Sequence, residues 1–441
     1  MRYYCVFTLL FVVVSMAQAQ DKELEDFFRR SLSGERRSEL SEGKIRIGNI
    51  ARERAAVWTA WKRANAAFRE EKLMETGDLS PERSGEWSIP DSLEPAARMS
   101  YYWGTKGEKP SGGFPVFLYL HGSGPREHEW AAGISLCRAF DDAPSLYFVP
   151  RIPNEGAYYR WWQKGKQYVW EKWLRQVLLR DDVDVDRLYV FGISEGGYGS
   201  QRLASFYADY WAAAGPMAGG EPLKNAPADN LRNMVFCLRT GAEDSGFYRN
   251  TLTRYVKEEL DSLSEAHPHE FIHRVELIPG RGHAIDYKPT TVWLKTFRRD
   301  MLSKHITWED FEMDGLHRRG FHNLVIHERP CDSLRTRYDM TVEGNLIRLQ
   351  VDDVHYSTVQ KDSVWGIEMK FRKTYTPSRH ASFTLYLDER LVDLKKEVTL
   401  VVNGRKVYQG RPQCSRRNMA RSLSVFYDPR RIYPAAIEVK L

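Results

Sequence analysis

One short stretch limits the fold of this chain more than any other, Gly192-Ile193-Ser194-Glu195-Gly196. It follows an apolar run at residues 188–191, and small residues after it lead into a helical pattern at residues 197–204. The sequence therefore predicts a strand, a sharp turn and a helix, with serine at the apex of the turn. Glycines suit such a turn because a strained backbone needs neighbours without Cβ atoms. An ordinary glycine-rich loop could have the same sequence, so the rest of the chain must distinguish it from a turn that presents a reactive serine.

Short apolar runs alternate with helical segments through the middle of the chain. Six runs are typical of buried strands, and residues 97–103 form an earlier candidate; the six are residues 116–120, 146–149, 188–191, 211–215, 234–238 and 271–278. Helical spacing marks residues 167–179 and 290–302. Apolar strands separated by helices indicate a mostly parallel sheet covered on both faces. The sequence thus predicts an α/β domain over residues 96–305.

Two further regions flank this domain. Residues 20–95 are expected to form a helical extension, in which Trp58 and Trp61 belong to an aromatic stripe that packs on the main body. Beyond residue 305 the strands alternate apolar and polar residues, and Asn403-Gly404 is a strong hairpin signal. We expect residues 306–441 to form an all-β sandwich domain of immunoglobulin-like type.

The chain begins with the pattern of a secretory leader. Met1-Arg2 precedes an apolar stretch that ends near Val14, and Ala17-Gln18-Ala19 resembles a cleavage site. The apolar stretch is short for a bilayer span, although a retained anchor is the alternative. We expect a signal peptide at residues 1–19, a secreted or periplasmic protein, and no stable membrane insertion after cleavage.

Charge and cysteine content exclude some classes of function. The 65 basic and 59 acidic residues leave a net charge of +6 without a dense basic stripe, so we expect no nucleic-acid partner. Outside the leader the scattered cysteines have neither metal-binding spacing nor the density of a disulfide framework. A bridge between Cys331 and Cys414 is left open, as is the oligomeric state. We expect no metal and no cofactor.

A serine at a strained turn becomes reactive only with a base beside it. His283 lies in a glycine-containing loop directly after the strand at residues 271–278. In the expected fold the order along the chain is nucleophile, acid and histidine, each on a loop after a strand. Ser194 and His283 are therefore the candidate nucleophile and base.

The acid is expected in the loop after the strand at residues 234–238. Two adjacent carboxylates, Glu243 and Asp244, lie there. We favour Asp244, because Gly-x-x-Asp is a common spacing after a strand and the shorter side chain suits a tight loop. Asp286 is a weaker candidate because it lies one helical turn beyond His283.

Backbone amides near the serine could stabilise an oxyanion. One donor is expected to be the amide of Glu195, the residue after the nucleophile. The turn after residue 120 reads His121-Gly122-Ser123-Gly124 and could present the second amide, which we assign to Ser123, with Gly122 or Gly124 as alternatives. We expect His121 to hold this loop rather than to act as a second base.

These motifs together resemble the α/β-hydrolase superfamily. The resemblance covers about residues 101–303 and is nearest to secreted bacterial esterases and peptidases related to polyhydroxybutyrate-depolymerase-like and feruloyl-esterase-like enzymes. Its motifs are His121-Gly122-Ser123-Gly124, residues 192–197, residues 214–220, residues 241–244 and Gly282-His283. The resemblance implies an eight-stranded, mostly parallel sheet and metal-free acyl transfer.

A dense aromatic cluster, Tyr158-Tyr159-Arg160-Trp161-Trp162, follows the strand at residues 146–149. Ligands of open α/β sheets bind beyond the carboxyl ends of strands. We therefore expect Tyr159, Trp161 and Trp162 to contact sugar rings or aromatic acyl groups, and Arg160 could hold a carboxylate. The alternative is that the cluster packs against Trp58 and Trp61 of the N-terminal extension.

The combined interpretation is a secreted serine esterase that acts on a carbohydrate-linked or other small ester through an acyl-enzyme. A serine peptidase of prolyl-oligopeptidase type is an alternative, since the same groups cleave amides, although no propeller-like repeats occur. A non-catalytic carbohydrate-binding or surface-interaction protein on a hydrolase scaffold is another alternative. The expected partner is a small-molecule or glycan ester.

Overall fold

The computed structural model describes residues 21–35, 40–330 and 334–441. The leader expected at residues 1–19 and Cys331 lie outside the described residues. Cys137, Cys237 and Cys414 are buried free thiols. Among the described helices, none has the length and apolar character needed to cross a membrane.

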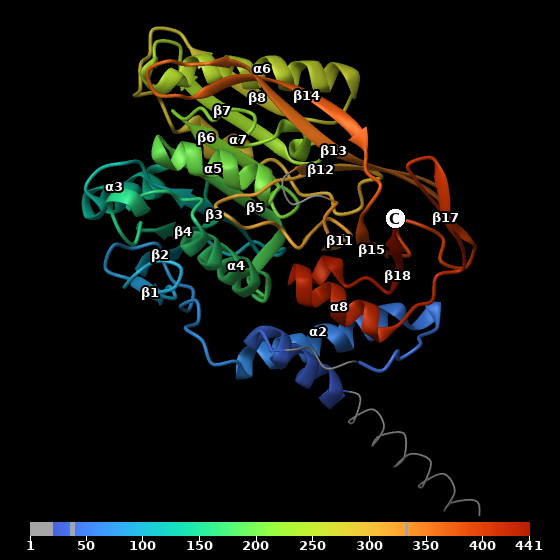
Figure 1. Cartoon of the computed structure of the whole chain (residues 1–441). Coiled ribbons are helices and arrows are strands. Elements are labelled where there is room, and N and C mark those ends of the chain that lie inside the picture. Colours follow the sequence, from blue (N-terminus) through green and yellow to red (C-terminus); the bar gives the residue numbers. More distant parts are fainter. Residues whose placement is uncertain (1–20, 36–39, 331–333) are drawn as a thin grey trace, which may run out of the picture.

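An eight-stranded sheet forms the centre of the molecule (Figure 1). Its strands are β1 (Ser84–Ser88), β2 (Arg98–Lys106), β3 (Phe114–Leu120), β4 (Ser145–Pro150), β5 (Val183–Ile193), β6 (Ala213–Met217), β7 (Val235–Gly241) and β8 (His273–Ile278). The order is β1-β2-β4-β3-β5-β6-β7-β8, in which β2 is antiparallel to both neighbours and the pairs from β4 to β8 are parallel. The mostly parallel sheet expected from the sequence is therefore present, and it starts at β1, before the expected domain boundary at residue 96.

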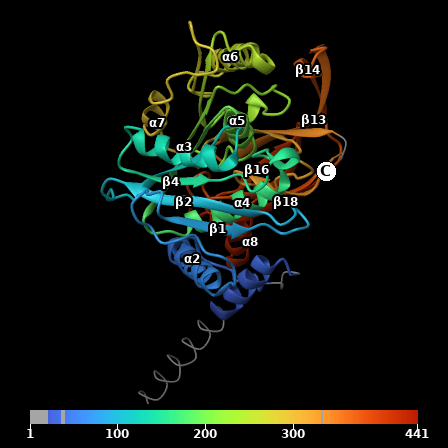
Figure 2. The same ribbon diagram turned by 90° about the vertical axis from the view of Figure 1, so that its left-hand side faces the viewer.

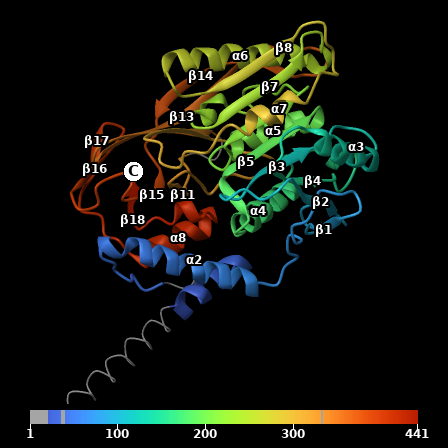
Figure 3. The same cartoon turned by 180° about the vertical axis from the view of Figure 1, so that it is seen from behind.

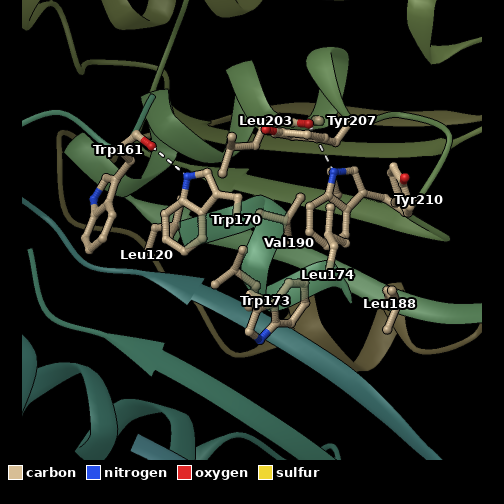
Figure 4. Packing of buried hydrophobic residues seen from close by; sticks show 14 of the residues in the cluster. Leu120, Trp161, Trp170, Trp173, Leu174, Leu188, Val190, Leu203, Tyr207 and Tyr210 are labelled. Atoms are coloured by element: carbon tan, nitrogen blue, oxygen red, sulfur yellow. Dashed lines mark hydrogen bonds between the residues drawn. The ribbon is translucent and has the colours of Figure 1, made fainter. Parts of the chain in front are cut away.

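Helices cover both faces of this sheet. They are α3 (Arg126–Ala139), α4 (Lys164–Leu178), α5 (Glu195–Phe206), α6 (Arg249–Ala266) and α7 (Pro289–Leu294). Successive side chains of β3 point to opposite faces, so Leu118 joins the core under α4, α5 and α6, whereas Phe117 joins the core under α3 and α7. Figure 4 shows Trp170 and Trp173 of α4 packed on the first of these faces beside Val190 of β5. The helix expected at residues 290–302 ends already at Leu294.

The C-terminal region contains two sheets that share one core. One has the order β10-β11-β15-β18, and the other has the order β17-β16-β13-β12-β9 with β14 paired to β13. The strands are β9 (His305–Asp310), β10 (Gly320–Phe321), β11 (Leu324–Glu328), β12 (Arg335–Glu343), β13 (Leu346–Lys361), β14 (Glu368–Pro377), β15 (Ser382–Leu387), β16 (Val398–Val402), β17 (Arg405–Gly410) and β18 (Ala435–Lys440). A helix, α8 (Arg416–Phe426), lies between β17 and β18, so the region is not all-β as expected. The immunoglobulin-like type remains a prediction.

The N-terminal helix α2 (Ile50–Ala67) packs on this C-terminal region, beside α8 (Figures 1 and 3). Trp61 of α2 is fully buried and stacks on Tyr427, with ring centroids 6.0 Å apart. Glu53 of α2 forms an ion pair with Arg416 of α8. The aromatic stripe of α2 therefore packs against the core of the C-terminal region. It covers neither the α/β domain, where the sequence predicted it, nor residues 158–162. An amphipathic pattern shows that a helix needs an apolar partner but does not say which one.

The strands β13 and β14 form a long hairpin that leaves the C-terminal core (Figures 1 and 2) and runs along α6 (Figure 1). Polar contacts join it to the α/β domain: Tyr255 of α6 donates to Gln360 at 3.3 Å, and Lys373 pairs with Asp229 at 2.6 Å. The alternating pattern at residues 345–351 predicted only the first half of β13. The hairpin brings the second domain to the edge of the central sheet where its parallel strands end.

Candidate active site

The serine turn has a backbone that only glycine neighbours permit. Ser194 has φ 57° and ψ −114°, between the end of β5 and the start of α5 at Glu195. A Cβ atom on Gly196 would lie 1.9 Å from the carbonyl oxygen of Leu120, and one on Gly192 would lie 2.3 Å from that of Gly196. Such distances exclude any larger residue, and the strained serine is the kind of backbone outlier that occurs at functional sites. The predicted strand, turn and helix are all present.

Three side chains from three loops form one hydrogen-bonded chain. The Oγ atom of Ser194 lies 3.0 Å from Nε2 of His283, and Nδ1 of His283 lies 2.7 Å from Oδ2 of Asp244. Asp244 follows β7 and His283 follows β8, as the sequence order predicts. With Nδ1–H donating to the carboxylate, Nε2 is free to accept the proton of the serine hydroxyl. The side chain of His283 is 44% exposed, so this hydrogen-bonded series of side chains is accessible from solvent.

The structure distinguishes the two adjacent carboxylates. Asp244 is buried, and its Oδ2 also accepts from Nε of Arg249 at 3.1 Å. Glu243 is exposed, and its backbone amide donates to Arg281. Asp244 is thus the carboxylate that contacts His283, which agrees with the shorter side chain favoured for this tight loop.

The loop at residues 121–124 lies directly beside the serine. A Cβ atom on Gly122 would lie 3.5 Å from Cβ of Ser194. The amides of Ser123 and Glu195 donate to no acceptor in the described part of the chain, so both remain available to a ligand. Glu195 is the first residue of α5, where backbone N–H groups have no partner within the helix.

His121 is a structural part of this loop. Its Nδ1–H donates to the carbonyl of Gly122 at 2.8 Å, and its Nε2 accepts from the amide of Ile152 at 3.1 Å. Burial lowers the pKa of His121 to about 4, so the ring is neutral and both nitrogens are engaged. Tyr159 and Trp161 hold the same loop, through bonds to Gly122 at 2.9 Å and to the carbonyl of His121 at 3.0 Å.

A cavity of about 420 Å³ begins at the residue after the serine. Its lining residues come from both domains; they are Arg160, Trp162, Glu195, Tyr198, Arg202, Gly220, Glu221, Pro222, Asn225, Phe247, Leu252, Trp365, Gly366, Ile367, Glu368 and Phe371. Of the aromatic cluster expected to contact substrate, Arg160 and Trp162 reach this cavity. Tyr159 and Trp161 are buried and do not line it, and they support the loop of His121 instead.

Two buried polar atoms of the cavity wall lack a partner among the described residues, Oε1 of Glu195 and the hydroxyl of Tyr198. Burial raises the pKa of Glu195 to about 7, although its other oxygen lies 3.4 Å from Nη1 of Arg160. Burial also raises the pKa of Tyr198. The sequence motifs predict a role only for the amide of Glu195 and none for Tyr198. The signal in the sequence that could have identified Tyr198 is its place on the first turn of the helix, four residues after Ser194.

No family model matches this chain, and no curated protein matches it. Solved structures that resemble it include a thermostable esterase, which is 17% identical over 48% of this chain and 59% of that chain, with a TM-score of 0.37. A ferulic acid esterase from Anaeromyces mucronatus is 14% identical over 49% of this chain and 88% of that chain (TM-score 0.35). The LpqC poly(3-hydroxybutyrate) depolymerase from Bordetella parapertussis is 15% identical over 49% of this chain and 90% of that chain (TM-score 0.36).

The sheet order, the serine turn and the order of the three loops are those of an α/β-hydrolase fold. The superfamily resemblance stated from the sequence motifs therefore holds for the fold. The chain spans 59% of the length of the thermostable esterase, and these similarities cover about half of the present chain.

Proposed function

We propose that this protein is a serine hydrolase that cleaves carboxylic esters through an acyl-enzyme. One observation carries the proposal: the continuous chain from Asp244 through His283 to Ser194, with the serine on a strained turn. A surface serine with a satisfied hydroxyl would need neither the strain nor the ordered imidazole.

The geometry suggests each step of the reaction. Ser194 Oγ attacks the ester carbonyl carbon while its proton passes to Nε2 of His283, and Asp244 stabilises the resulting imidazolium. The amides of Ser123 and Glu195 donate to the oxyanion of the tetrahedral intermediate. The intermediate expels the alcohol, which takes the proton from His283, and leaves an acyl-serine. Water then attacks the acyl-serine with His283 as base, which releases the acid and restores Ser194.

The cavity supports the proposed substrate class. It begins beside the serine turn and is lined by aromatic rings, with Phe247 and Trp365 exposed in its wall, which suits a carbohydrate-linked or other small ester. From the leader pattern at residues 1–19 we further propose that the protein works outside the cytoplasm, secreted or in the periplasm.

A fluorophosphonate probe and 4-nitrophenyl acetate test this proposal. The full chain without its leader should be labelled and should hydrolyse the ester, and Ser194→Ala should abolish both. Ser135→Ala is the matched control, because Ser135 is an exposed serine on α3 far in sequence from the turn. Label that persists in Ser194→Ala would refute the assignment. Faster cleavage of aminoacyl amides than of acetylated or feruloylated sugars would instead indicate a peptidase.

A further inference from the structure

The cavity beside Ser194 has one wall that belongs to the second domain. Trp365, Ile367 and Phe371 come from the β13–β14 hairpin, whereas Trp162 and Tyr198 come from the α/β domain. Figure 1 shows this hairpin reaching from the C-terminal sheets along α6. A cavity that starts at Glu195 and ends on another domain cannot be complete in the α/β domain alone.

An aromatic pair from the two domains meets at this cavity. The rings of Phe247 and Trp365 lie 4.9 Å apart at 50°, and both are largely exposed, Phe247 at 48% and Trp365 at 60%. Phe247 and Tyr248 have φ values of 50° and 59°, in the same loop as Asp244. Left-handed backbone at two consecutive bulky residues is costly, so a function for the presented ring is the simplest account.

Hydrogen bonds and an ion pair hold the hairpin wall of the cavity in position. Asp362 accepts hydrogen bonds from the amides of Val364 and Trp365 at 2.8 and 2.9 Å, and also from the hydroxyl of Tyr248 at 2.9 Å. Lys224 pairs with Glu368 at 2.9 Å. The exposed Trp365 is therefore held toward the cavity by contacts that link it to the α/β domain.

The polar side of the cavity suits a neutral, hydroxyl-bearing group. Charged side chains around it are paired with one another: Arg202 with Glu221 at 2.7 Å, Arg160 with Glu195 at 3.4 Å, and Glu368 with Lys224. An ionic ligand would have to displace one of these pairs. The buried Oε1 of Glu195, which is 7% exposed as a residue, and the hydroxyl of Tyr198 have no partner within the described ranges. Buried polar atoms of this kind favour a ligand that brings hydroxyl groups.

We propose that this two-domain cavity is the site that selects the substrate, and that it binds a neutral ring with apolar faces and hydroxyl groups at its edge. The faces contact Trp365 and Phe247, and the hydroxyl groups bond to Glu195 and Tyr198. A sugar of the alcohol part and a phenolic acyl group share this chemistry. The role in selection rests on the proposed esterase function, whereas the binding itself does not.

Binding to the Ser194→Ala protein tests the cavity without any turnover. Xylotetraose serves as the sugar probe and methyl ferulate as the phenolic probe, each titrated by calorimetry and tryptophan fluorescence. We expect saturable binding of at least one probe. Trp365→Ala in the same background should weaken it about 10-fold, and Tyr198→Phe about 5-fold.

The adjacent Val364→Ala is the matched control, because Val364 is 71% exposed and does not line the cavity. The dissociation constant of the probe for the protein with Val364→Ala and Ser194→Ala should equal that for Ser194→Ala alone. Trp365 is also exposed, so its removal should leave the unfolding midpoint unchanged, which separates lost contact from misfolding. In the protein with Ser194 intact, Trp365→Ala should lower kcat/KM for a feruloylated or acetylated oligosaccharide about 10-fold more than for 4-nitrophenyl acetate.

Three results would overturn the proposal. They are no binding of either probe, binding that Trp365→Ala and Tyr198→Phe leave unchanged, and preferential binding of a charged aminoacyl amide. Failure of the esterase function has a different signature, since it would show as absent fluorophosphonate labelling while the titrations still report on the cavity.

Discussion

The two walls of the cavity are built by different means. On the α/β side, backbone contacts fix the serine turn, because Gly196 lies so close to Leu120 that no side chain fits. On the hairpin side, an exposed Trp365 is held by side-chain bonds such as that between Tyr248 and Asp362. Steric exclusion fixes the backbone at the reacting serine. The side chains of the hairpin wall, in contrast, can be substituted without disturbing the sheet. In our proposal the chemistry therefore belongs to the rigid wall and the selection to the adjustable one.

The largest effect is expected at the acid on the rigid wall. Asp244→Asn should lower kcat for 4-nitrophenyl acetate by about 10⁴-fold, because the amide cannot hold the required tautomer of His283 or stabilise its cation. Glu243→Gln is the control, since Glu243 is exposed and does not contact His283. Loss of activity in Glu243→Gln alone would show that the acid is misassigned.

The backbone of the rigid wall should tolerate almost no change. Gly196→Ala places a methyl group 1.9 Å from the Leu120 oxygen, so β3 and α5 must separate. We expect a loss of about 4 kcal/mol in the free energy of unfolding, measured with urea. Gly48→Ala, where the added Cβ meets no atom within 4 Å, should change it by less than about 0.5 kcal/mol. Equal effects of the two substitutions would contradict the steric account.

A buried ion pair links the two domains and can be removed by one substitution. Arg431 of the second domain contacts Asp209 of the first, and both are fully buried. Burial opposes ionisation of Asp209, but Arg318 and Arg431 outweigh it and lower its pKa. Arg431→Met should cost about 3 kcal/mol at pH 7, because it leaves Asp209 with one partner fewer.

The pH dependence has a definite sign. A lowered carboxyl pKa stabilises the fold above the pKa of about 3.9 in the unfolded chain, and this stability disappears as the pH falls through the lower folded value. The difference in the free energy of unfolding between wild type and Arg431→Met, measured with urea, should therefore become smaller below about pH 4. A constant difference down to pH 2.5 would argue against an ionic origin.

The smallest expected effect lies where the two walls meet. Glu195 has a raised pKa of about 7, so its stabilising protonated form is fully present below about 4.5 and is lost as the pH rises through 7. Glu195→Gln should therefore raise the free energy of unfolding at pH 8 by about 2 kcal/mol, with the gain disappearing toward pH 4.5. Such a gain together with weaker binding of the ring probe is the pattern of a residue kept for function. Destabilisation at pH 8 would contradict it.

Much of the α/β domain could be predicted because its signals are local. Continuous apolar runs marked β3, β4 and β5, and loops after successive strands placed Ser194 and His283 at one edge of the sheet. The position of the acid could be predicted in the same way, to one of two adjacent carboxylates. The structure separated Asp244 from Glu243, because Asp244 is buried and bonds to His283 whereas Glu243 is exposed. The direction of strands in a parallel sheet makes such loops meet whatever the details of packing.

The rest was decided by tertiary structure. The aromatic stripe of α2 predicted a buried face, yet its partner proved to be the second domain. Trp365 and Phe371 lie about 170 residues beyond Ser194, and no local pattern links a polar hairpin to a distant cavity. By itself the sequence determined the serine turn and its two partners, because glycine sterics and strand order act over a few residues. The second wall required the folded chain, because it is made by side-chain contacts between segments that only domain docking brings together.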